Sequence, residues 1–228
     1  MSEEKKSVLI AGATGLVGGF CLARFLADES YGRITVLGRR ELPHPPDDPR
    51  LVQVVTDFER LSEHAGKLVA DDVVIALGST LKKAGSRANF HKVDFGHSFA
   101  VARIARENGA KQLLLISALG ADRKSVSFYS RVKGDLEEAV RGLNYPSLSI
   151  FRPSLIMGRR REFRPTEELA KSIVPWISFA IPRRYRAIPA ETIAAALWLA
   201  ARIEKPGLTV YESEAIDELY HSVKKGWK

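Results

Sequence analysis

The chain has 228 residues, of which 45% are hydrophobic and 27% charged, which excludes a disordered chain and predicts one globular domain over residues 1–228. Lysine and arginine outnumber aspartate and glutamate by 35 to 27, so the formal charge of +8 favours an anionic partner. The single cysteine, Cys21, excludes an internal disulfide and a zinc site, so no metal is predicted and a reducing, cytoplasmic compartment is expected. Because no uncharged run reaches the ~18 residues of a spanning helix, no membrane partner is expected.

Short apolar runs alternate along the chain with longer amphipathic stretches. The runs predict buried strands at Ser7–Ala11, Ile34–Leu37, Leu51–Val55, Val73–Leu77, Gln112–Ser117, Leu148–Phe151 and Leu208–Glu212. The amphipathic stretches predict helices at Leu16–Ala27, Asn89–Glu107, Ser127–Arg141 and Ala190–Arg202. This alternation predicts an α/β fold, a doubly wound parallel sheet with helices on both faces. Residues 157–186 break the alternation, and we expect a small substrate-side segment there.

A glycine-rich turn, GATGLVG at residues 12–18, joins the first predicted strand to the first predicted helix. Glycines let the backbone approach a diphosphate, and the helix N-terminus offers free N–H groups and a positive dipole end. In this context the turn predicts a Rossmann-type dinucleotide site. The alternative is a turn whose glycines serve only tight packing. The predicted cofactor-binding residues of the turn are Gly12, Thr14, Gly15, Leu16, Val17 and Gly18.

The residues after the second predicted strand distinguish NAD(H) from NADP(H). The strand Ile34–Leu37 is followed by Gly38, Arg39 and Arg40, without a carboxylate that would bind the ribose hydroxyls. A guanidinium can pair bidentately with a 2′-phosphate, which a carboxylate would repel. We therefore predict NADP(H), held by Arg39 and Arg40. The alternative is that both arginines are solvated loop residues.

Two later strand ends complete the predicted cofactor site. Asp57 and Phe58 follow the third strand, where a carboxylate could accept a hydrogen bond from the adenine amino group. Leu77, Gly78 and Ser79 follow the fourth strand, where glycine allows close approach to the ribose. Residues of these types are also common in ordinary turns, which is the alternative for each strand end.

Tyr129 and Lys133 lie four residues apart in a predicted helix, so they share a face. Reduction of a carbonyl by hydride needs a proton for the oxygen, and a nearby ammonium lowers the phenol pKa from about 10 toward the working range. The same lysine could hold the nicotinamide ribose. Ser117, at the end of the fifth strand, is predicted to bond the substrate carbonyl, or else to cap the next turn. The same spacing recurs at Tyr220 and Lys224 near the C-terminus, which we interpret as chance.

Seven segments carry a resemblance to a known family: GATGLVG (12–18), LGRR (37–40), TDFERL (56–61), ALGST (76–80), ISALGAD (116–122), YSRVKGDLE (129–137) and FRPSLIMG (151–158). In this order they resemble the short-chain dehydrogenase/reductase superfamily, and within it the atypical branch of the Tat-interacting oxidoreductases and their bacterial relatives. The resemblance implies a Rossmann fold, NADP(H) binding and reductase activity. It assigns Tyr129 as the acid–base catalyst with Lys133 as its partner. It also implies that the main chain at Pro153 and Leu155 approaches the nicotinamide.

The chain departs from the family at two positions. Many relatives carry two serines where this chain has Ser117-Ala118, and Asp94 stands where a helix-four asparagine often completes the proton relay. Two functions therefore stay open. The first is an NADP(H)-dependent oxidoreductase for a small carbonyl or alcohol substrate, and the second is an NADP(H)-sensing regulator without turnover. Homodimerisation through the fourth and fifth helices is compatible with the sequence.

Two basic clusters, at residues 159–164 and 183–186, account for part of the positive charge. They are either solvated surface or a basic rim beside a phosphate-bearing ligand. No nucleic-acid-binding module or interleaved aromatic platform accompanies them, so nucleic acid is not the predicted partner.

Overall fold

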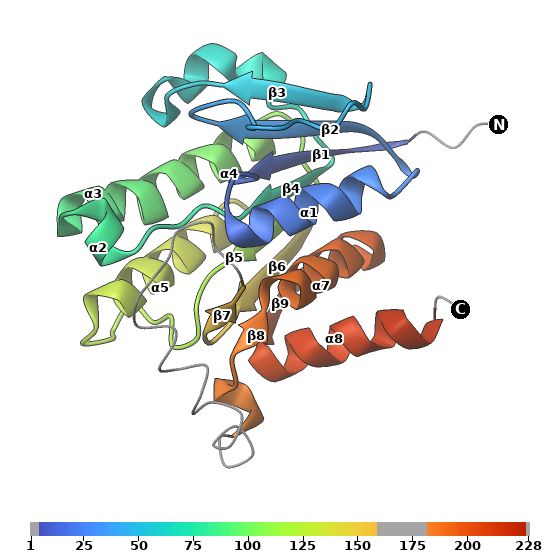
Figure 1. Cartoon of the computed structure of the whole chain (residues 1–228). Helices are drawn as coiled ribbons and strands as arrows, with labels where there is room; N and C mark the ends of the chain where they lie inside the picture. The colour runs from blue at the N-terminus through green and yellow to red at the C-terminus, as the bar shows by residue number, and fades with distance from the viewer. Residues whose placement is uncertain (1–4, 159–181, 227–228) are drawn as a thin grey trace.

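The computed structural model describes residues 5–158 and 182–226. Its centre is a seven-stranded sheet in the order β3-β2-β1-β4-β5-β6-β9, with parallel pairing throughout (Figure 1). The prediction of a doubly wound parallel sheet is confirmed. The strands are β1 (Lys6–Ala11), β2 (Tyr31–Gly38), β3 (Leu51–Val55), β4 (Asp72–Ile75), β5 (Gln112–Ile116), β6 (Ser147–Arg152) and β9 (Gly207–Glu212).

Helices cover both faces of the sheet, because successive strand residues point to opposite sides and both sides are apolar. Val8 and Ile10 of β1 join one core cluster, while Leu9 and Ala11 join the other. The first face carries α1 (Leu16–Leu26), α7 (Ala190–Ile203) and α8 (Ser213–Gly226). The second face carries η1 (Phe58–Lys67), α4 (Ser98–Glu107) and α5 (Phe128–Arg141).

The helix predicted at Asn89–Glu107 proves to be three consecutive segments. These are α3 (Arg87–His91), the π-helix η2 (Lys92–His97) and α4. A π-turn holds one more residue than an α-turn, so it shifts which side chains face inward. The apolar pattern of the sequence followed an uninterrupted α-helix and could not reveal this shift.

Several shorter elements were not predicted. The described chain also contains α2 (Leu81–Ala84), the two-residue strands β7 (Ile156–Met157) and β8 (Ile188–Pro189), and the 3-10 turn η3 (Arg183–Tyr185). Strand β4 starts at Asp72 and ends at Ile75, so Ala76 and Leu77 lie in the loop that follows it rather than in the strand. The basic cluster at 159–164 and most of the predicted substrate-side segment lie outside the described residues.

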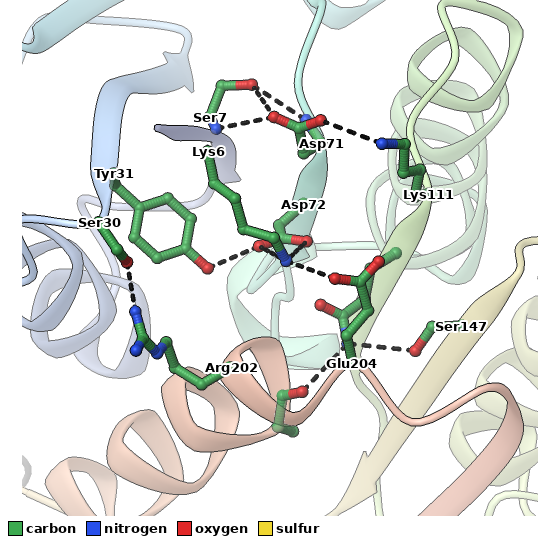
Figure 2. Close-up of polar contacts among 12 residues, drawn as sticks. Lys6, Ser7, Ser30, Tyr31, Asp71, Asp72, Lys111, Ser147, Arg202 and Glu204 are labelled. Atoms are coloured by element: carbon green, nitrogen blue, oxygen red, sulfur yellow. Dashed lines mark hydrogen bonds and ion pairs between the residues drawn. The ribbon is translucent and has the colours of Figure 1, made fainter. Parts of the chain in front are cut away.

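A polar network joins the amino ends of the strands (Figure 2). Its members, called here the amino-edge network, are Lys6, Tyr31, Asp72 and Glu204. The buried Asp72 carboxylate accepts a hydrogen bond of 2.6 Å from the Tyr31 hydroxyl, and Lys6 Nζ lies 3.4 Å from both of its oxygens. The Lys6 ammonium also pairs with Glu204 at 2.6 Å. Burial outweighs these contacts and raises the pKa of Asp72 to about 6.

Candidate functional site

The predicted site residues lie at the opposite edge of the sheet, where the parallel strands end. The turn after β1 packs directly on the loop after β4: Gly12 has a φ of +99°, and a Cβ there would lie 2.7 Å from the Ala76 carbonyl. A Cβ at Gly18 would lie 2.1 Å from the Gly12 carbonyl oxygen. These two glycines are therefore required by close backbone packing, whereas Thr14 and Gly15 are exposed at the mouth of the turn.

The N-terminus of α1 has features that suit an anion. Gly15 occupies the N-cap without a side-chain hydrogen bond, and the first turn contains no acidic residue. By contrast, Thr80, Ser86 and Ser127 each cap their own helix with a side-chain oxygen. The first amides of α1 therefore lack a side-chain acceptor, and their dipole end is positive. The turn and the helix fit a bound diphosphate.

Two exposed arginines follow β2. Neither Arg39 nor Arg40 has an ion pair or a hydrogen bond among the described residues. Most other arginines in the described part of the chain are held by a carboxylate or a carbonyl, as Arg50 is by Asp48 at 2.7 Å. The two guanidinium groups therefore keep their hydrogen-bond donors available to a ligand phosphate.

The residues after β3 take partly different positions from those predicted. The Asp57 carboxylate caps η1 by accepting the Glu59 amide at 3.2 Å, which leaves further lone pairs for a ligand. The Phe58 ring is buried and stacks on His97, with ring centroids 5.0 Å apart. Burial and the charges of Lys92 and Arg39 lower the pKa of His97. Phe58 could therefore contact a cofactor only through its backbone.

The loop after β4 lies over a buried ion pair. Lys133 Nζ is 2.8 Å from Asp94 Oδ1, and the two side chains are 4% and 1% exposed. Asp94 Oδ2 accepts the Ser79 amide at 2.8 Å. A Cβ at Gly78 would lie 3.6 Å from Asp94 Oδ1 and 3.9 Å from Lys133 Nζ. The loop predicted to face the ribose therefore sits directly above the lysine predicted to hold it.

Tyr129 lies on α5 one turn before Lys133, as the spacing predicted. Its ring is partly exposed and packs against Phe90, with centroids 5.5 Å apart. Within the described ranges its hydroxyl has no hydrogen-bond partner, so it can take one from a ligand. The helix comes close to the loop after β5, because a Cβ at Gly134 would lie 2.3 Å from the Arg123 amide.

Ser117 has a partner that neither sequence interpretation foresaw. The residue is buried, and its hydroxyl donates to Glu137 Oε1 at 2.5 Å. Glu137 is in turn held by Arg152, whose Nε and Nη2 lie 3.0 and 2.5 Å from its two oxygens. The serine thus ties the end of β5 to α5, and a role toward substrate stays a prediction.

The segment after β6 runs past the glycine turn. The Pro153 carbonyl accepts the Leu119 amide at 2.9 Å, and the Leu155 carbonyl accepts the Ile188 amide at 2.8 Å. A Cβ at Gly158 would lie 2.7 Å from the Leu16 side chain. The approach of Pro153 and Leu155 to a nicotinamide stays a prediction, but their segment does border the turn.

The sequence could not reveal three contacts of this site. They are the pairing of Asp94 with Lys133, the stacking of His97 on Phe58 and the bond from Ser117 to Glu137. Asp94 and His97 both belong to the π-helix η2, which leaves no mark in the apolar pattern. The sequence gave one indication of these contacts: Asp94 is a carboxylate within a predicted amphipathic helix, and a carboxylate is seldom buried without a partner.

The sheet, the glycine turn and the tyrosine and lysine on α5 define a Rossmann-type α/β protein. Protein HTATIP2 of Rattus norvegicus is 35% identical over 196 residues, which covers 85% of this chain and 80% of that protein. The mitochondrial protein fmp52 of Emericella nidulans is 36% identical over 170 residues, covering 72% of this chain and 73% of the relative. No family model matches the chain. The chain belongs to the atypical short-chain dehydrogenase/reductase family that includes HTATIP2.

Solved structures share the fold at lower identity. The UDP-N-acetylglucosamine 4-epimerase of Methanobrevibacter ruminantium M1 superposes with a TM-score of 0.71 at 15% identity, over 97% of this chain and 82% of that chain. The enzyme WbmH of Bordetella bronchiseptica, solved in complex with NAD+, gives 0.70 at 19% identity, over 97% and 81%. In residues 5–158 and 182–226, every helix is too short or too polar to span a bilayer.

Proposed function

We propose that the protein is an NADP(H)-dependent oxidoreductase of the short-chain dehydrogenase type that acts on a small carbonyl or alcohol. The observation that carries this proposal is the placement of Lys133, which is buried beneath Gly78 and lies on the same helix as Tyr129. A proton donor and a cation then stand beside the loop where a ribose would lie. Similarity in fold to an enzyme solved with NAD+ supports the class of cofactor.

Each part of the dinucleotide has residues that would hold it. The amides of the glycine turn and of α1 would hold the diphosphate. Asp57 would accept the adenine amino group, and Lys133 would donate to the nicotinamide ribose. The bound cofactor would supply or accept the hydride.

The proposal of NADP(H) rather than NAD(H) rests on the end of β2. Arg39 and Arg40 supply donors for a 2′-phosphate, and neither of these first two residues after β2 is a carboxylate that would bind the ribose hydroxyls. The neighbours solved with NAD are under 25% identical and do not decide this choice.

Proton transfer would fall to Tyr129. In reduction its phenol gives a proton to the carbonyl oxygen, and in oxidation the phenolate removes a proton from the alcohol. The Lys133 ammonium would attract the phenolate, and the Asp94 carboxylate 2.8 Å away would offset part of that attraction. Ser117 would have to release Glu137 before its proton could reach a substrate oxygen, so its proposed contact needs a rearrangement that the tyrosine does not.

Turnover tests the proposal. Wild-type protein is incubated with NADPH and a broad panel of small carbonyl compounds, and the loss of NADPH is followed. We expect consumption with at least one member and a large loss of rate in Tyr129→Phe. Tyr220→Phe is the matched control, because it has the same spacing to a lysine but lies on α8. A Tyr129→Phe protein as fast as wild type would remove the tyrosine from the mechanism.

A second candidate is a regulator that binds NADP(H) without turnover. It is favoured by one observation: both Lys133 and Ser117 are already bound to buried carboxylates, from Asp94 and Glu137. It predicts tight NADPH binding with no consumption across the same panel.

The single cysteine keeps the cytoplasm as our proposed compartment, although the fungal relatives are named as mitochondrial proteins. Fractionation of cells would decide between these compartments.

A further inference from the structure

Asp94 is a buried acid at the centre of the proposed catalytic edge. It lies in the π-helix η2 and is 0% exposed. One carboxylate oxygen lies 2.8 Å from Lys133 Nζ, and the other accepts the Ser79 amide at 2.8 Å. The acid therefore joins three elements: η2, α5 and the loop after β4. π-turns occur often at functional sites, where they point one residue inward.

The ion pair reduces the electrostatic effect that we expect Lys133 to have on the Tyr129 phenol. An isolated ammonium one helical turn away would favour the phenolate and lower the phenol pKa. A carboxylate in contact with that ammonium offsets part of its field, because two opposite charges so close together act as a dipole. In this structure Lys133 is not an isolated cation.

Other charged groups near the start of α5 are more exposed to solvent. Arg87 of α3 lies over the Phe128 ring at 5.2 Å, and Arg131 of α5 is bonded to the Ser125 carbonyl at 2.8 Å. Asp122, in the loop after β5, is exposed. Water and salt screen such groups. The pair of Asp94 and Lys133 is buried and is therefore screened less.

We propose that Asp94 is a positioning residue that holds Lys133, offsets its charge toward Tyr129 and so favours carbonyl reduction over alcohol oxidation. This inference rests on the proposed function. In reduction the O–H bond of the Tyr129 phenol would break and its proton would go to the carbonyl oxygen, and the phenolate would then recover a proton from water. The hydride for the carbonyl carbon would be supplied by a bound reduced dinucleotide. Oxidation instead requires the phenolate from the start, which Asp94 disfavours.

Titration of Tyr129 tests the proposal without substrate or cofactor. The ultraviolet absorbance of tyrosinate is recorded against pH, and the curve of Tyr129→Phe is subtracted to isolate this residue. In wild type we expect the midpoint to stay well above neutral pH. In Asp94→Asn we expect it to fall by about one pH unit, since the lysine charge is no longer offset. The amide oxygen of the asparagine can still accept the Ser79 amide, which holds the loop in place.

A conservative variant separates charge from structure. Asp94→Glu keeps the negative charge, so its midpoint should return toward the wild-type value. A folded Asp94→Asn protein with an unchanged or higher midpoint would overturn the proposal. If Asp94→Asn does not fold, the wild-type curve alone decides, because a midpoint near neutrality would contradict the offset of charge.

The titration and the measurements of NADPH binding and consumption can fail independently, so the role of Asp94 and the oxidoreductase function are tested separately. If the midpoint shifts as expected but NADPH does not bind, the oxidoreductase proposal fails while the effect of Asp94 on Tyr129 stands. If NADPH is consumed and the midpoint does not shift, the oxidoreductase stands and the role of Asp94 is rejected. In turnover, Asp94→Asn should move the alkaline limit of the reduction rate to lower pH.

Discussion

The two edges of the sheet differ in whether their polar groups are paired within the protein. At the amino edge, Asp72 is bonded by Tyr31 and approached by Lys6, which also pairs with Glu204 (Figure 2). At the carboxyl edge, α1 begins without a side-chain cap, and Arg39 has no ion pair among the described residues. One edge uses its charges to join strands to α7, and the other leaves donors available to a ligand. Ligands of open α/β sheets bind at the carboxyl edge.

Lys133 is the exception at the carboxyl edge, and its removal should have the largest effect. Lys133→Met leaves the Asp94 carboxylate buried without its cation, which is expected to lower the free energy of unfolding by about 3–5 kcal/mol. Urea denaturation would measure this loss. The double variant with Asp94→Asn should recover part of it, because the buried charge is then gone. Additive losses in the two variants would contradict the pairing.

Asp72 gives the second prediction, a pH dependence of stability. Its pKa is raised to about 6 in the folded protein, against ~3.9 for a free aspartate. The folded state therefore binds this proton more tightly, and stability from this group increases as pH falls from 7 to 4, by about 2–3 kcal/mol. The difference in unfolding free energy between wild type and Asp72→Asn should grow by that amount over this range. A constant difference would show that Asp72 does not titrate between pH 7 and 4. NADPH binding by Asp72→Asn should equal that of wild type.

Arg39 and Arg40 give the third prediction. Replacing both with alanine should weaken NADPH binding by roughly 10- to 100-fold, about 1.4–2.7 kcal/mol, while NADH binding changes little. Arg33→Ala is the matched control, since Arg33 is also an exposed arginine of this region but lies within β2, away from its carboxyl end. Calorimetric titration with the two nucleotides measures both affinities. An equal loss of affinity for NADPH and NADH would contradict a contact between these arginines and the 2′-phosphate.

Local patterns predicted the parts of the fold that depend on neighbouring residues. Apolar runs gave the strands, glycine spacing gave the turn at 12–18, and the i to i+4 relation placed Tyr129 and Lys133 on one helix. Contacts between distant residues gave no such signal. Lys6 and Glu204 are 198 residues apart in sequence, and the Ser117 hydroxyl finds its partner 20 residues later. These pairings depend on the register of the folded sheet, which no local window contains.

The most direct test of the central claim is calorimetry of NADPH with wild type and Gly15→Asp. Gly15 is the exposed N-cap of α1 with a φ of −82°, which an aspartate can adopt, but a Cβ there would lie 3.1 Å from the Gly12 carbonyl oxygen, so the turn has to shift slightly. Its carboxylate would occupy and repel the position proposed for the diphosphate. We expect that wild type binds NADPH, and that Gly15→Asp folds but does not bind it. Well-folded wild-type protein that takes up no NADPH, or Gly15→Asp that binds as tightly as wild type, would contradict it.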